Sequence, residues 1–183
     1  MPPKLLLTNI LLFQVGWFAC VLGGANAQPW TGTAIALAII LIHLWLAADL
    51  FAELKLIMVA LLIGLIFESS LVAFQLVDYT HVAISPELAP IWMIMLWGLF
   101  ATTLNVSLNW LKNISIWWVG LIAFTFAPLA YFSGARLGAI SFDDNALSLG
   151  VIALGWSILF PLMVLISTKL SSSSINSRTE AIS

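Results

Sequence analysis

The chain has 183 residues, of which 62% are hydrophobic and only 8% are Asp, Glu, Lys or Arg. A soluble domain carries about 25% charged residues, so this chain cannot cover a water-facing surface and is predicted to be an integral membrane protein. The net charge of −2 is small and argues against a nucleic-acid partner. The single cysteine, Cys20, excludes an internal disulfide and a multi-cysteine metal site.

Six stretches are long and apolar enough to cross a bilayer as helices, which takes about 20 mostly apolar residues. They are residues 5–23, 31–48, 54–77, 91–111, 114–133 and 146–167. These stretches show no alternation typical of barrel strands, and helices satisfy their own backbone groups in lipid. The sequence therefore predicts an all-α bundle of six transmembrane helices within residues 1–169. The polar tail, residues 170–183, is expected to be disordered.

The first span could be mistaken for a signal peptide, because Ala25 and Ala27 occupy the positions of an A-x-A cleavage site. Cleavage there would leave five spans. The apolar run before the site is about 19 residues, however, and signal peptides have about 7–15. We therefore expect the first span to be retained.

Positive charge predicts the orientation of the bundle, because cytoplasmic loops are rich in Lys and Arg. Five of the six basic residues fall on one side: Lys4, Lys55, Lys112, Lys169 and Arg178. Arg136 is alone on the other side. This asymmetry predicts that both termini lie in the cytoplasm.

The third span contains a carboxylate, Glu68, within roughly one helical turn of its midpoint. A charge at the bilayer centre costs from about 3 to more than 10 kcal/mol, so Glu68 must be protonated or paired. Gly64 and Gln75 share its helical face, which should point into the bundle, and a glycine lets another helix come close. His43 is the only basic side chain expected near the midplane, so a His43–Glu68 contact is a hypothesis. Whether Glu68 serves function or packing is left open.

Other polar residues fall inside the predicted spans. Gln14 lies near the centre of the first span and completes a candidate intramembrane polar site with Glu68, His43 and Gln75. Asn105 and Asn109 are four residues apart and would share a face of the fourth helix. Such amides often do no more than bond across a helix interface.

A second candidate site lies at the outer end of the fifth span, in the segment FAPLAYFSGARLGAISF. It holds Tyr131 and the isolated Arg136. Arg136 is expected either to neutralise a lipid head-group phosphate or to form a salt bridge with Asp143, Asp144 or Glu87.

The chain lacks the motifs of common catalytic and metal centres, including HExxH, G-x-S-x-G and the P-loop. Its two histidines are too few for a convincing metal site. No metal or cofactor is therefore expected, and enzymatic activity is left open.

Three segments together resemble a bacterial inner-membrane family that is classed only as a domain of unknown function. They are TNILLFQVGWFACVLG in the first span, PIWMIMLWGLFATTLNVSLNWL in the fourth and APLAYFSGARLGA in the fifth. The resemblance implies a small polytopic protein of the bacterial inner membrane. It carries no activity and therefore assigns no catalytic residue.

Three functions remain open on the sequence. The favoured one is binding, modifying or handling a lipid or another apolar molecule within the bilayer. The second is a small proton-coupled transporter that uses Glu68, which at this chain length would be expected to act as a homodimer. The third is a non-catalytic partner that assembles or anchors another membrane protein.

Overall fold

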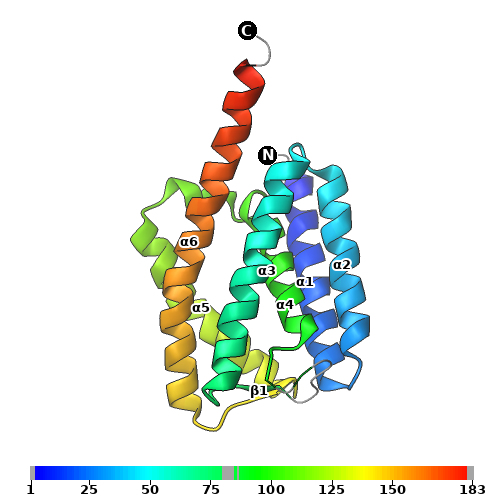
Figure 1. Cartoon of the computed structure of the whole chain (residues 1–183), viewed down its shortest axis with the longest axis vertical. Coiled ribbons are helices and arrows are strands. Elements are labelled where there is room, and N and C mark those ends of the chain that lie inside the picture. Colours follow the sequence, from blue (N-terminus) through cyan, green and yellow to red (C-terminus); the bar gives the residue numbers. More distant parts are fainter. Residues whose placement is uncertain (1–2, 80–84, 86, 181–183) are drawn as a thin grey trace.

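The described part of the chain, residues 3–79, 85 and 87–180, forms a bundle of six α-helices in the computed structural model (Figure 1). The helices are α1 (Pro3–Ala25), α2 (Pro29–Leu46), α3 (Leu50–Ala73), α4 (Ile91–Leu104), α5 (Ile116–Arg136) and α6 (Asn145–Glu180). A 3-10 helix, η1 (Asn109–Asn113), follows α4. The two short strands β1 (Asp78–Tyr79) and β2 (Ile140–Ser141) pair antiparallel.

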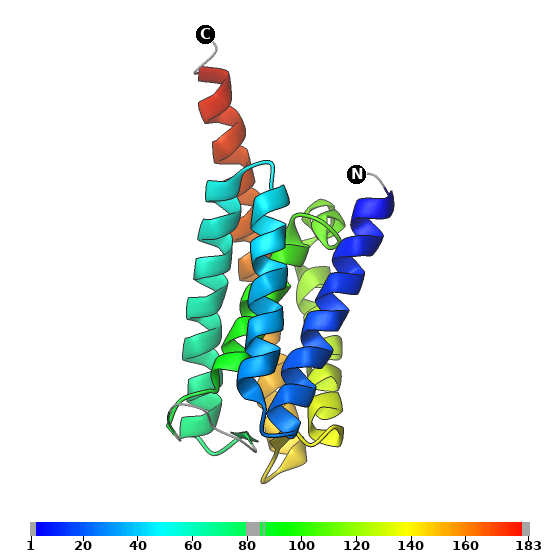
Figure 2. The same cartoon turned by 90° about the vertical axis from the view of Figure 1, so that its right-hand side faces the viewer.

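Five of these helices are long and apolar enough to cross a membrane, and α4 is apolar but has only 14 residues. The prediction of an all-α transmembrane bundle is therefore confirmed. Both termini lie at one end of the bundle, and α6 projects beyond the other helices there (Figures 1 and 2). Arg136 ends α5 at the opposite end.

Helix α4 lies at the centre of the bundle and packs against α1, α2 and α3. Eleven of its 14 residues are buried. A helix that is apolar all round is expected in such a position, because each of its faces meets another helix. Its length does not have to match the bilayer, since its neighbours shield it from lipid.

The fourth helix was predicted over residues 91–111 but ends at Leu104. Turns follow, and Asn9 of α1 binds this non-helical backbone: the Ser107 amide and hydroxyl donate to Asn9 Oδ1 over 3.3 and 2.6 Å. The Asn9 amide in turn donates to the Thr102 carbonyl over 3.2 Å. Buried backbone groups outside a helix need partners from elsewhere in the protein, and Asn9 supplies them.

Helix α6 was predicted to end at residue 167 and to be followed by a disordered tail. The helix instead continues to Glu180, while residues 181–183 lie outside the described part. No Gly or Pro follows Pro161 in this segment. The Ser171 hydroxyl donates to the Ser167 carbonyl one turn earlier over 2.9 Å, a bond that is compatible with the helical backbone.

Candidate functional site

Glu68 of α3 has no exposed surface, and its carboxylate accepts three hydrogen bonds from aromatic side chains. The Trp97 indole Nε1 of α4 donates to Oε1 over 2.7 Å, and the Tyr79 hydroxyl of β1 donates to Oε2 over 2.7 Å. The Tyr131 hydroxyl of α5 also donates to Oε1. The two carboxyl oxygens together have enough lone pairs to accept all three bonds.

Gly64 explains how Trp97 reaches Glu68. It lies one helical turn before Glu68, and a Cβ at Gly64 would be only 2.6 Å from Trp97 Cδ1. A residue with a side chain at this position would push the indole away from α3. Gly64 and Glu68 are both buried, whereas Gln75, which was predicted to share their inward face, is exposed beyond the end of α3.

The third donor, Tyr79, is positioned by the strand pairing. Tyr79 of β1 lies opposite Ile140 of β2, which ties the α3–α4 connection to the α5–α6 connection. The Tyr79 side chain is 3% exposed. Burial raises the pKa of its phenol well above the ordinary value, and the nearby Glu68 carboxylate raises it further. Tyr79 therefore stays protonated and remains a donor.

A cavity of about 290 Å³ lies between α1, α4, α5 and α6, next to this cluster. Its aromatic wall comprises Phe13, Trp17, Trp92, Trp97, Phe100, Phe126, Tyr131, Trp156 and Phe160. The volume is at the lower end of the range of about 300–1,000 Å³ for small-molecule sites. Its mostly apolar lining with a few polar atoms is also typical of such sites.

The Glu68 cluster holds one side of this cavity in place. Trp97 and Tyr131 line the cavity and bond to Glu68. Trp156 stacks on Trp97 with ring centroids 4.4 Å apart, and its indole nitrogen donates to the Tyr131 hydroxyl over 3.3 Å. The buried carboxylate thus fixes three wall residues from three helices.

Another wall residue, Trp92, has an indole nitrogen with no hydrogen-bond partner in the described part of the chain. Trp92 is 1% exposed and packs against Gly24 of α1. A buried donor without a partner costs about 1–3 kcal/mol. An acceptor on a bound molecule would remove this penalty.

A groove of about 600 Å³ between α1 and α5 adjoins the cavity, and both are lined by Phe13, Trp17 and Ala130. Gln14 and Arg136 also line the groove, and both side chains are exposed. Neither makes a hydrogen bond or ion pair with another described residue.

The salt-bridge alternative for Arg136 is therefore not what the structure shows. The acidic residues considered for it, Asp143, Asp144 and Glu87, all lie in the described part of the chain, where the ion pair found is His43–Glu53.

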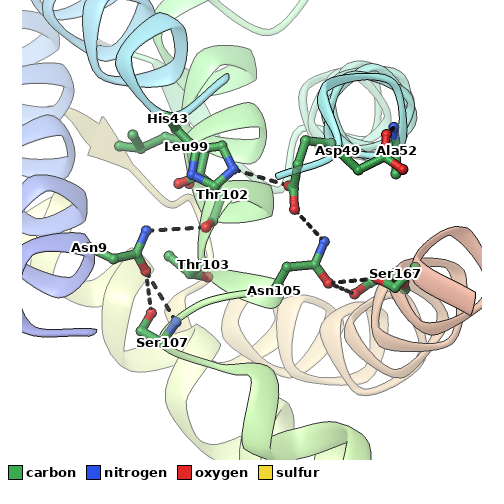
Figure 3. Close-up of polar contacts among 12 residues, drawn as sticks. Asn9, His43, Asp49, Ala52, Leu99, Thr102, Thr103, Asn105, Ser107 and Ser167 are labelled. Atoms are coloured by element: carbon green, nitrogen blue, oxygen red, sulfur yellow. Dashed lines mark hydrogen bonds and ion pairs between the residues drawn. The ribbon is translucent and has the colours of Figure 1, made fainter. Parts of the chain in front are cut away.

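A second polar cluster, drawn in Figure 3, lies near the α2–α3 turn, at the end of the bundle that carries the termini (Figure 1). His43 Nε2 lies 3.0 Å from Glu53 Oε2, and the Asn105 amide donates to Glu53 Oε1 over 2.8 Å. The Asn105 oxygen accepts from Lys112 Nζ over 2.5 Å and from Ser167 over 2.8 Å. Burial lowers the pKa of the Lys112 amine, and the Glu53 carboxylate partly offsets this effect.

The hypothesis of a His43–Glu68 contact is wrong, because His43 pairs with Glu53. Glu53 and Glu68 are about 22 Å apart along α3, given a rise of about 1.5 Å per residue. The predicted shared face of Asn105 and Asn109 is also absent, since α4 ends before both residues. Asn105 is half-buried, whereas Asn109 is exposed.

The structure separates the other predicted site residues. Gln75 lies beyond the end of α3 with a φ of 56° and is exposed. Gln14 lies in the groove, and Tyr131 bonds to Glu68 while Arg136 faces the groove. In the described residues, no group of three or more His, Cys, Asp or Glu side chains could hold a metal ion.

Sequence reasoning missed Tyr79, Trp97 and Trp156 as members of the cluster. Tryptophan in a membrane protein usually marks the interface. Trp97 and Trp156 stand well inside their apolar segments, and a buried indole N–H usually has a partner. Their position inside the predicted spans could therefore have indicated that both indoles are buried and hydrogen-bonded. Nothing in the local sequence of Tyr79 could have shown that it bonds to Glu68.

Together these features define a helical, membrane-spanning protein with a buried carboxylate cluster and an apolar cavity within the bundle. Residues 6–162 match the family described as protein of unknown function (DUF2878), and the chain belongs to that family. No curated protein and no solved structure matches the chain. The membership agrees with the resemblance found in the sequence.

Proposed function

We propose that this protein binds a lipid or another apolar molecule within the bilayer. The observation that carries the proposal is the cavity of about 290 Å³, with its aromatic wall and its adjoining groove between α1 and α5. An apolar chain gains little by moving from lipid into protein, so binding would depend on close packing and on polar contacts. The aromatic wall provides surfaces for close packing. The polar atoms of Trp92, Gln14 and Arg136 provide the polar contacts.

Glu68 would act in this function by positioning the cavity wall. Its side chain is fully buried, and it holds Trp97 and Tyr131 directly and Trp156 through Tyr131. A wall that is ordered before binding lowers the entropy lost on binding. This gives the costly intramembrane carboxylate a role without requiring it to touch the ligand.

Proton-coupled transport through Glu68 is the alternative. It would require Glu68 to change protonation state in each cycle. Glu68 has no exposed surface, and a proton arriving on its carboxyl would have to replace at least one of the three donated hydrogen bonds. The geometry thus supports the binding function better.

We propose further that the protein lies in the bacterial inner membrane with both ends in the cytoplasm. The end of the bundle with the termini also carries Lys4, Lys55, Lys112 and Lys169, whereas Arg136 lies at the other end. This distribution is the one expected for cytoplasmic termini. Labelling in intact cells of single cysteines introduced at Asn109 and Leu137, in a chain whose buried Cys20 is replaced by Ala, tests it, with only the second expected to react from outside.

The binding function is tested by extracting the molecules that co-purify with the full-length protein in mild detergent and counting them by mass spectrometry. Ala127 lines the cavity and is 9% exposed, so Ala127→Phe should fill it. Leu129 lies on the same helix, outside the cavity lining and 54% exposed, so Leu129→Phe is the matched control. We expect a bound apolar molecule in the wild type and the control, and its loss in Ala127→Phe. Equal occupancy in folded Ala127→Phe contradicts the proposal.

A further inference from the structure

We infer that the bound molecule is an anionic amphiphile with a single hydrocarbon chain, whose acidic head lies at Arg136 and whose chain passes between α1 and α5 into the cavity. This inference rests on the proposed function. It adds the chemical class of the ligand and the route by which it enters.

The route follows from how the helices pack. Helix α5 packs most extensively on α6, and α1 packs most extensively on α2 and α4. The groove lies between α1 and α5, and Phe13, Trp17 and Ala130 border both the groove and the cavity. A chain that lies in the groove is therefore next to the cavity without crossing the packed interfaces of α4.

The acidic head follows from Arg136. Of the six basic residues, Arg136 alone belongs to the end of the bundle opposite the termini. Its exposed side chain lines the groove and forms no ion pair with a described residue. A guanidinium binds a phosphate or a carboxylate through two parallel hydrogen bonds. The groove thus presents a basic group at one end and an apolar cavity beside it, as an anionic amphiphile requires.

Gln14 adds a polar contact within the groove. Its exposed amide can both donate and accept, and it forms no hydrogen bond with a described residue. A polar amide at membrane depth is costly unless it has a partner. An ester or hydroxyl group between the acidic head and the chain would provide one.

The cavity volume favours a single chain. About 290 Å³ is at the low end of small-molecule sites, and the wall around it is fixed by the stacked Trp97 and Trp156 and by Tyr131. A second acyl chain would have to stay outside in the lipid. Two-chain phospholipids should therefore bind more weakly than their single-chain counterparts.

The test is a titration of the full-length protein in non-ionic detergent, followed by native mass spectrometry. The probes are oleoyl lysophosphatidic acid, oleic acid, monooleoylglycerol and dioleoyl phosphatidic acid. We expect at least one of the two single-chain acids to bind about tenfold more tightly than the neutral glyceride and the two-chain lipid, a difference of about 1.4 kcal/mol. The tighter of the two acids shows whether the head is a phosphate or a carboxylate.

The variants separate this inference from the binding function. Arg136→Gln should weaken the acids to the level of the neutral glyceride, whereas Arg136→Lys should keep part of the preference. Lys55→Gln, which removes an exposed cation at the other end of the bundle, should change nothing. Ala127→Phe should weaken every single-chain probe.

Two results overturn the claims separately. If Ala127→Phe reduces binding but Arg136→Gln leaves the preference for acids unchanged, or if no such preference exists, the ligand class is wrong and the cavity function stands. If folded Ala127→Phe binds every probe as the wild type does, the cavity function itself is wrong.

Discussion

Trp97 on α4 donates its indole hydrogen to Glu68 on α3 across 2.7 Å, between two side chains that are 2% and 0% exposed. This bond joins the buried carboxylate to the wall of the cavity, because Trp97 also lines the cavity. Burying a carboxylate is unfavourable unless hydrogen bonds replace its water. The aromatic donors from β1, α4 and α5 provide that replacement.

We expect Trp97→Phe to destabilise the protein more than Trp92→Phe. Both tryptophans are buried on α4 and both changes remove similar volume. Only Trp97 loses a hydrogen bond to a carboxylate, which is worth about 1.5–3 kcal/mol. Unfolding of the two variants in mild detergent measures the difference. Equal losses of stability would show that the Trp97–Glu68 bond contributes nothing net.

Glu68→Gln should lower the stability by about 1–3 kcal/mol, because the neutral amide keeps one acceptor oxygen for the three aromatic groups and places an N–H where the second oxygen accepted a bond. The control is Glu87→Gln, at an exposed carboxylate, which should leave stability unchanged. Thermal unfolding at neutral pH compares the variants with the wild type. A Glu68→Gln variant as stable as the wild type would show that the carboxylate is not a structural link.

Gly64→Ala should also destabilise, by about 1–3 kcal/mol, because the added methyl group overlaps the Trp97 ring and forces it away from Glu68. Gly150→Ala on α6 is the matched control, since a Cβ there meets no atom within 4 Å. We expect unchanged or slightly higher stability for the control. The near-ultraviolet circular dichroism of Gly64→Ala should change as the indole moves, and an unchanged spectrum with unchanged stability contradicts the packing described.

At the other end of the bundle, Asn105→Ala should destabilise by at least about 1 kcal/mol, since it removes the partner of Glu53, Lys112 and Ser167 together. Asn109→Ala changes an exposed amide four residues later and should have little effect. The comparison is made by chemical unfolding in mixed micelles. Similar effects for both variants would mean that the Asn105 network does not stabilise the fold.

Lys112 predicts a pH dependence. An exposed lysine amine has a pKa of 10.5, and partial burial lowers the pKa of the Lys112 amine in the folded protein. Between the folded and the unfolded pKa, the unfolded chain therefore binds more protons than the folded one. Stability should therefore rise with pH through that interval. We expect the unfolding temperature of the wild type to rise relative to Lys112→Gln as alkaline pH increases. A constant or falling difference contradicts the lowered pKa.

The sequence alone determined the class of the protein and much of its helical architecture. Apolar runs of membrane length predict transmembrane helices because lipid offers no partners for the backbone. The same reasoning marked Glu68 and placed Gly64 beside it on an inward face, since a helix repeats every 3.6 residues.

Hydropathy could not place the end of α4 at Leu104, because apolar residues continue among the polar ones as far as Leu111. The non-helical backbone there is held by Asn9, nearly one hundred positions earlier. Likewise, α6 continued through a serine-rich segment whose composition is typical of disorder.

Only the tertiary structure decided which side chains meet. Glu68 received Tyr79, Trp97 and Tyr131 as partners, while His43 paired with Glu53. The partners of Glu68 lie 11, 29 and 63 positions further along the chain, on three different elements. Helical periodicity fixes the direction of a side chain within its own helix, but the packing of helices against one another determines what that side chain contacts. The cavity between α1, α4, α5 and α6 exists for the same reason.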